Sequence, residues 1–315
     1  MKQFILKILL FFFPAFAYSI FAILFMPYFL SLSNGPSTKD QITYSFENAS
    51  NLEYELLILG NSRTYRGINP ERLSIKSFNF SHDNDSYNQI YYKLKYLIDI
   101  EKDIKYLILG VDYFQFSFKS DTRNYVYADF LDSKYMDDFE ESSVFVKNMD
   151  YYFNNINPKK ILSLYPKENK PFLRQNGQYI KTGFAKETDT ITRDMNRLEF
   201  QIKYFVKTLS LCSNKNIKVF MVNLPTRQNE LKSYTNNEID EFDNFIKSYV
   251  DNKYVFYLNF STLEGFTTED YTDITHFNEK AANRFTELLN IKILEINIDE
   301  KLSTSAQQHS LKSCG

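Results

Sequence analysis

Residues 56–70 read LLILGNSRTYRGINP, an apolar run that ends in Gly-Asn-Ser and passes at once into charged sequence. Consecutive apolar residues are typical of a strand that is buried on both faces of a parallel sheet. Ser62 would then stand where this strand ends and a helix begins. Two interpretations are open. Ser62 could be the N-cap of the helix, or it could be a nucleophile beside first-turn N–H groups that can stabilise an oxyanion.

Strand-like and helix-like segments alternate along the chain. The short apolar runs predict strands at 55–59, 77–80, 106–111, 217–223 and 254–258. The segments with helical spacing of apolar residues predict helices at 63–73, 87–100, 191–213, 237–250 and 278–289. This alternation predicts an α/β fold in three layers, a doubly wound parallel sheet of flavodoxin-like type between helices. We expect one domain over 52–295, with an insertion at about 113–190 where no regular period is found.

The N-terminus predicts a membrane anchor. Lys2 and Lys7 precede a stretch, 8–32, that contains no charged residue and is long enough to cross a bilayer as a helix. A cleavable signal peptide has a shorter apolar core and a small-residue cleavage site. We therefore expect an uncleaved single-pass anchor over 1–33, with the lysines in the cytoplasm and the rest of the chain extracytoplasmic. Residues 34–51 are expected to be a linker and 296–315 a flexible tail.

A serine nucleophile requires a general base, and the chain has three histidines. His276 stands just before the predicted helix at 278–289, and Asp273 precedes it by three residues. A tight turn with this spacing can present both side chains to the same space. The carboxylate would hold the Nδ1 proton and leave Nε2 to face Ser62. The sequence therefore predicts a catalytic triad of Ser62, His276 and Asp273.

Two sequence blocks resemble those of the SGNH hydrolase superfamily, also called GDSL-like esterases. Gly60-Asn61-Ser62 is similar to the Gly-Asp-Ser block of that family, and Asp273-Ile274-Thr275-His276 is similar to its Asp-x-x-His block. The resemblance extends over about 52–293. The run 60–70 looks most like the membrane-anchored members of cell-surface glycan O-acylation systems.

This resemblance implies a serine O-acyltransferase or esterase. Its substrate would be the acyl esters, acetyl esters in the first place, of a cell-surface polysaccharide. In such systems a multi-span membrane acyltransferase is the partner that supplies the acyl group. No cofactor is implied.

Two further blocks of the family are altered here. The second block corresponds to 78–86, which includes Asn79 and lacks the glycine whose N–H serves the oxyanion. The third block, Gly110-Val111-Asp112-Tyr113, has Asp112 where the family has an asparagine donor. An ionised Asp112 cannot donate, so it is protonated, or holds another group, or the oxyanion hole is built differently. These departures support the alternative function, a catalytically inactive glycan-binding or assembly component of a polysaccharide-modification complex.

Several charged residues near the predicted strand ends are candidates for substrate binding. Arg63 and Arg66 could bind an anionic glycan or acyl donor, or they could form a solvated helix face. Arg227 is a weaker candidate for the same role. His82, in a polar loop after a short strand, is expected at the surface.

The remaining composition excludes several classes of site. The 37 basic and 39 acidic side chains give a formal net charge of −2, and no basic cluster stands out, so we expect no nucleic-acid partner. Two cysteines, Cys212 and Cys314, provide neither a disulfide framework nor a cysteine metal site. His-x-x-x-His spacing and glycine-rich phosphate loops are absent from the sequence, so no metal or nucleotide cofactor is expected.

Overall fold

The computed structural model describes residues 1–26, 28–29, 37–139, 149, 153, 156–157, 172–191 and 193–312, with side chains as far as residue 296. The chain divides into two compact units. The first unit comprises residues 1–47 and 120–173, and the second comprises 48–119 and 174–315. All residues of the predicted site belong to the second unit.

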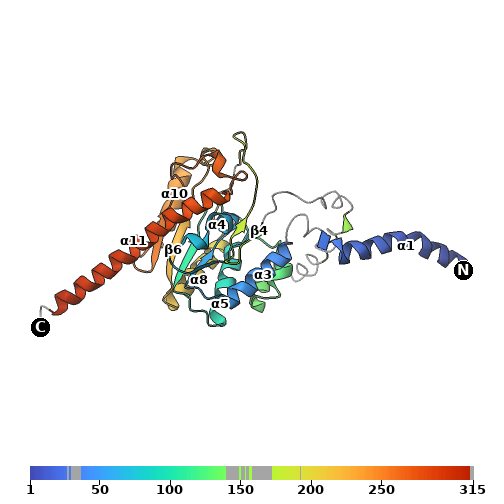
Figure 1. Ribbon diagram of the computed structural model, residues 1–315, viewed down its shortest axis with the longest axis horizontal. Helices are drawn as coiled ribbons and strands as arrows, with labels where there is room; N and C mark the ends of the chain where they lie inside the picture. Colours follow the sequence, from blue (N-terminus) through green and yellow to red (C-terminus); the bar gives the residue numbers. More distant parts are fainter. Residues whose placement is uncertain are drawn as a thin grey trace. The chain divides into compact units, whose positions relative to one another are not determined.

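The second unit contains a parallel sheet of five strands (Figure 1), as predicted. The strands are β1 (Leu56–Leu59), β2 (Ser77–Asn79), β3 (Tyr106–Gly110), β6 (Lys218–Asn223) and β7 (Val255–Asn259). They lie in the order β2-β1-β3-β6-β7. The second strand along the chain, β2, is therefore added on one side of β1, and the later strands β3, β6 and β7 are added on the other side. Ligands of such sheets bind beyond the carboxyl ends of the strands at this switch in direction, where β1 and β3 end.

Helices connect these strands. They are α4 (Ser62–Gly67), η1 (Pro70–Arg72), α5 (Tyr87–Asp99), α8 (Glu199–Asn214), α9 (Gln228–Leu231), α10 (Asn236–Lys247), η4 (Thr268–Asp270) and α11 (Glu279–Lys312), and a short strand, β5, spans Tyr179–Ile180. Crossovers between parallel strands are right-handed. The connection from β1 to β2 and the connections that lead from β3 to β6 and β7 run in opposite directions along the sheet, so their helices lie on opposite faces. The α/β architecture with helices on both faces of the sheet is therefore confirmed.

The core explains why the strand sequences are apolar at every position. All four residues of β1 are fully buried. Leu56 and Ile58 belong to a cluster with Phe285 and Leu289 of α11, and their neighbours Leu57 and Leu59 point to the other face because side chains alternate along a strand. Two-sided burial of this kind removes alternation from the sequence pattern.

The helix predicted at 63–73 is divided in two. Helix α4 ends at Gly67, and η1 begins at Pro70. Pro70 has no N–H, and its ring disfavours helical geometry at the preceding residue. Asn69 takes the N-cap position and accepts a hydrogen bond from the Glu71 N–H (3.1 Å).

Two segments outside the predicted domain are also more regular than expected. Residues 38–51 of the predicted linker form helix α3 (Thr38–Asn51), which buries Ile42 and Phe46 and stacks Phe46 on Phe130. The linker prediction missed this i, i+4 apolar pair within a polar segment. The backbone of α11 continues to Lys312, so the predicted flexible tail is helical as far as that residue.

The first unit contains the predicted membrane anchor. Its elements are α1 (Lys2–Leu24), the first part of α3, α6 (Asn124–Tyr127), η2 (Ser133–Asp138) and β4 (Phe172–Leu173). By length and composition, α1 could cross a membrane. Residues 27 and 30–36 of the anchor and linker predictions lie outside the described residues, as do 140–148, 150–152, 154–155 and 158–171 of the predicted insertion.

Candidate active site

Ser62 is the first residue of α4, directly after β1. The N-cap of this helix is Asn61, whose Oδ1 accepts a hydrogen bond from the Arg63 N–H (2.8 Å). The interpretation of Ser62 as the cap is therefore wrong. Because Asn61 caps the helix, the Ser62 hydroxyl is available for another contact.

The structure brings Ser62 together with Asp273 and His276. Ser62 Oγ lies 2.7 Å from His276 Nε2. His276 Nδ1 lies 2.8 and 2.9 Å from the two carboxylate oxygens of Asp273. A tight turn produces this arrangement, since Asp273 Oδ1 also accepts hydrogen bonds from the N–H groups of Thr275 (3.0 Å) and His276 (3.1 Å). The Asp-x-x-His spacing thus places the carboxylate and the imidazole as the sequence predicted.

The ionisation of this pair suits a general base. Burial lowers the pKa of His276 below 6.5, an effect that its hydrogen bond to Asp273 opposes in part. Burial would raise the pKa of Asp273, but hydrogen bonds from His276, Thr275 and Lys181 outweigh it, and the pKa of Asp273 falls well below 3.8. At neutral pH the imidazole is therefore neutral and the carboxylate is charged. With Nδ1–H held by Asp273, His276 presents a lone pair at Nε2 to the Ser62 hydroxyl.

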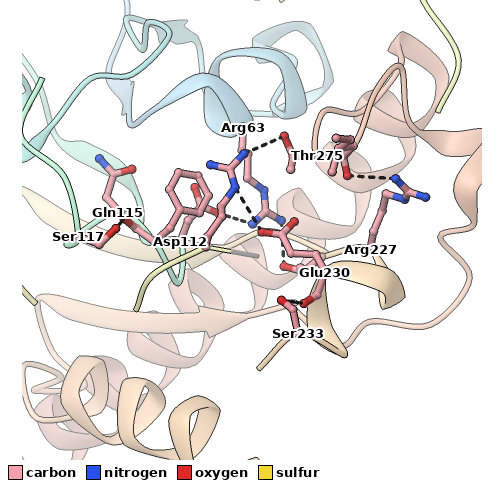
Figure 2. A network of polar contacts seen from close by, with 12 residues as sticks. Arg63, Asp112, Gln115, Ser117, Arg227, Glu230, Ser233 and Thr275 are labelled. Atoms are coloured by element: carbon pink, nitrogen blue, oxygen red, sulfur yellow. Dashed lines mark hydrogen bonds and ion pairs between the residues drawn. The ribbon is translucent and has the colours of Figure 1, made fainter. Parts of the chain in front are cut away.

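Arg63 and Asp112 are buried against each other and do not reach a substrate site. Arg63 Nη1 lies 2.9 Å from Asp112 Oδ1, with side-chain exposures of 2% and 0%. Figure 2 shows the pair, with the carboxylate of Glu230 beside it. Arg63 Nη2 also donates to the carbonyl oxygens of Leu224 (3.1 Å) and Pro225 (2.8 Å). The prediction of direct oxyanion or substrate contact does not fit either residue, because Asp112 holds Arg63 in place.

Asn61 connects this ion pair to the helix start. Its Nδ2 donates to Asp112 Oδ2 (2.7 Å) and to the side chain of Gln115, which in turn donates to the Asp85 carbonyl (2.7 Å). The residue before the candidate nucleophile is therefore held by the chain after β3.

Asn79 and Arg66 also have partners within the protein. Asn79 is fully buried, and its Nδ2 donates to the carbonyl oxygens of Thr64 and Ile68 (3.0 Å each), so it joins the end of β2 to α4 and not to an oxyanion. Arg66 is 6% exposed and binds both carboxylate oxygens of Asp83 (2.7 and 2.8 Å). Arg63 and Arg66 are both buried, so they do not form a solvated helix face. The positive charge of Arg66 acts on His276.

Two further predicted positions are interior. His82, expected at the surface, is 2% exposed, and its Nδ1 lies 2.6 Å from the ammonium group of the buried Lys93. Arg227 is 4% exposed and donates to the carbonyl oxygens of Lys186 (3.0 Å) and Ile274 (3.4 Å). Arg227 therefore supports the loop that carries the histidine.

Two glycines, Gly60 and Gly110, lie at the carboxyl ends of the adjacent strands β1 and β3, next to α4. Leu59 of β1 pairs with Leu109 of β3, and Gly60 and Gly110 follow them. A Cβ at either glycine would lie 2.3 Å (Gly60) or 2.2 Å (Gly110) from Thr64 Oγ1. Glycine at both positions lets α4 approach the strand ends, and this approach places Ser62.

Sequence reasoning missed Lys181, which donates to Asp273 Oδ2 at 3.1 Å. It lies in a segment without a regular period, so no sequence signal connected it to the site. Among the described residues, no group of three or more His, Cys, Asp or Glu side chains is arranged to hold a metal ion.

The C-terminal part of the site lies in a range that matches a known protein family. A protein-family model, which carries no functional description, matches residues 174–297. This range is less than half of the chain and includes Asp273 and His276 but not Ser62. No curated protein matches the sequence.

Two solved structures show a partial likeness. A candidate acylhydrolase from Bacteroides fragilis NCTC 9343 has 9% sequence identity and a TM-score of 0.41, covering 82% of this chain and 99% of that chain. A candidate platelet activating factor protein from Streptococcus pneumonia has 11% identity and a TM-score of 0.39, covering 80% and 90%.

Proposed function

We propose that this protein is a membrane-anchored serine O-acyltransferase or esterase that acts on acyl esters, acetyl esters in the first place, of a cell-surface polysaccharide. One observation carries the chemical part of this proposal. Ser62 Oγ lies 2.7 Å from His276 Nε2, and Asp273 holds the opposite ring nitrogen. This is the nucleophile–base–orienter arrangement that acyl transfer requires.

The proposed reaction has two halves. Ser62 Oγ attacks the acyl carbonyl while His276 Nε2 takes the hydroxyl proton, and Asp273 stabilises the imidazolium that forms. The tetrahedral intermediate collapses to an acyl-Ser62, and His276 returns the proton to the departing alcohol. A water molecule or a sugar hydroxyl then attacks the acyl-enzyme with His276 again as base, which releases the acid or the acylated sugar.

The oxyanion is the weaker part of this site. Asp112 occupies the place of the expected asparagine donor and is engaged by Arg63. The N–H of Ser62 itself, in the first turn of α4, is the donor that we propose in its place. Loss of one oxyanion donor raises a barrier by roughly 3 kcal/mol. We therefore expect slow turnover of simple esters, because acylation and deacylation both pass through an oxyanion.

The anchor, the substrate and the partner rest on other grounds. Helix α1 is long and apolar enough to cross a membrane, and the two lysines near its N-terminal end, Lys2 and Lys7, favour an extracytoplasmic site. The polysaccharide substrate and a multi-span acyltransferase partner rest on the motif resemblance at 60–70.

The test uses the full chain in detergent, treated with a fluorophosphonate probe and with a chromogenic acetyl ester. We expect labelling and turnover in the wild type, and loss of both in Ser62→Ala and His276→Gln. Ser248→Ala, at the exposed end of α10, is the matched control and should be labelled like the wild type. A folded wild type without labelling would support the alternative, a non-catalytic glycan-binding or assembly component, for which the Asp112–Arg63 pair is the supporting observation.

A further inference from the structure

A short segment, residues 181–187, lies along the loop that carries the catalytic carboxylate. We call it the strap. The Ala185 N–H donates to the Tyr271 carbonyl (3.1 Å), and the Lys186 carbonyl accepts from Arg227 (3.0 Å). At the other end of the strap, Lys181 reaches Asp273. The strap therefore runs beside residues 271–273, with Ala185 at Tyr271 and Lys181 at Asp273.

The contact between Lys181 and Asp273 completes the surroundings of the carboxylate. Lys181 Nζ lies 3.1 Å from Asp273 Oδ2. Asp273 Oδ1 already accepts from two backbone N–H groups, and both oxygens face His276 Nδ1. Lys181 is the side-chain cation on Oδ2, so the contact opposes rotation of the carboxylate away from the imidazole.

Gly183 allows the strap to come this close. Its φ is +149°, and a Cβ at this position would lie 2.6 Å from the Thr272 carbonyl oxygen. Because that oxygen belongs to backbone, a side chain at 183 would displace the strap from the loop. Lys181 would then move away from Asp273.

We propose that Lys181 is a positioning residue, which holds Asp273 Oδ2 and through it controls the orientation and charge of His276. Its catalytic meaning rests on the proposed function, whereas its effect on the charge of His276 does not.

The sign of the effect follows from the charges around His276. Asp273 on its own loop favours the imidazolium, as does Asp83 from the loop after β2, while Arg66 of α4 disfavours it. Lys181 adds a second cation, bound to the same carboxylate that His276 uses. Its removal therefore raises the pKa of His276. Lys181 is 43% exposed and Asp273 31% exposed, so solvent screens the interaction and the expected rise is about half a pH unit.

The experiment measures the pKa of His276 directly. The full chain is labelled with [13C]histidine in detergent, and its three histidine signals are followed against pH. His276→Gln identifies the signal of His276. The variants are Lys181→Met, Lys181→Arg and Gly183→Ala. Lys253→Met, an exposed lysine before β7 and thus at the opposite end of the strands, is the matched control.

The proposal predicts the same upward shift in Lys181→Met and Gly183→Ala, no additional shift in the double variant, and a wild-type value in Lys181→Arg and Lys253→Met. The fluorophosphonate labelling rate of Lys181→Met should fall about twofold at pH 6 and less at pH 8. A His276 pKa in Lys181→Met that equals the wild-type value overturns the proposal. A normal shift in a protein that the probe does not label would overturn the proposed function alone, so the two failures are distinguishable.

Discussion

The guanidinium of Arg63 and the carboxylate of Asp112 meet at 2.9 Å in the interior, one residue after Ser62 and two residues after the end of β3. Burial lowers the pKa of Arg63, but the charges of Asp112 and Glu230 outweigh it and the net pKa is raised. The pair joins the ends of adjacent strands at the switch in chain direction. It therefore stabilises the position of the helix that begins with Ser62.

Asp112→Asn should destabilise the protein, although it introduces the asparagine found at this place in the family that the two motifs resemble. The change leaves the Arg63 guanidinium without its paired carboxylate in a site of almost no exposure. Removal of one member of a buried ion pair costs about 3 kcal/mol or more. Thermal unfolding of the full chain in detergent, followed by circular dichroism, measures the loss.

The control for this change is Asp99→Asn on α5. Asp99 is half-exposed beside its partner Lys95, and the change should cost below about 0.5 kcal/mol. Arg63→Gln combined with Asp112→Asn should lose less stability than the sum of the single changes. Full stability in Asp112→Asn alone would contradict the role assigned to the pair.

Asp273→Asn should retain the fold and lose most reactivity. An amide at this position can donate to His276 Nδ1, which places the proton on Nε2 and removes the base that faces Ser62. The corresponding change in a serine protease lowers the rate by about four orders of magnitude, and we expect a loss of roughly 10³-fold in fluorophosphonate labelling. Asp240→Asn, on the exposed side of α10, should label at the wild-type rate. Equal rates in the two variants would remove Asp273 from the mechanism.

The labelling rate should follow a single ionisation below pH 6.5. Burial holds the pKa of His276 under that ordinary value, so the neutral base is already present at pH 7. The rate should be level above about pH 7 and should fall on acidification. A midpoint above pH 6.5 in labelling measured from about pH 5 to about pH 8.5 would contradict the assigned environment.

The free energy of unfolding should also fall on acidification. His276 binds a proton more weakly in the folded than in the unfolded chain, so its contribution is complete above about pH 6.5 and is lost as the pH falls through the folded value. Asp273, whose folded pKa is also depressed, adds a further loss below about pH 3.8. His276→Gln should remove the first part of this acid dependence, which thermal unfolding at several pH values would show.

Gly110→Ala should destabilise the protein, and Thr64→Ala should rescue it. The added methyl group would lie 2.2 Å from Thr64 Oγ1 but 3.4 Å from Thr64 Cβ, so removal of the hydroxyl relieves the clash. Overpacking of this kind costs about 1 to 3 kcal/mol. Gly60→Ala is the matched comparison, because its methyl group would lie 2.7 Å from Thr64 Cβ and the same second change should not rescue it. Equal rescue of both, measured by thermal unfolding, would contradict the packing described here.

The sequence predicted the strands and the Asp-x-x-His turn because both depend on local patterns. The run 56–59 is apolar throughout, since both of its faces are buried, and the Asp-x-x-His turn closes within four residues. The role of Asn61 as cap and the partner of Asp112 could not be predicted. Asparagine and serine are both favoured caps, so the sequence does not decide between Asn61 and Ser62. The partner of Asp112 is Arg63, which follows the end of a different strand. The contact of Lys181 and the helix at 38–51 were not predicted. Their segments lack the periodic apolar pattern on which the predictions relied.

Ser62 and His276 are separated by 214 positions in the chain. At a synthesis rate of 5 to 20 residues per second, the serine precedes its base by on the order of 10 to 40 s. A nascent chain that has already formed β1 therefore carries a hydroxyl of ordinary reactivity. The proposed acyl chemistry requires the loop after β7 to dock beside Ser62, so it would be coupled to the completion of folding.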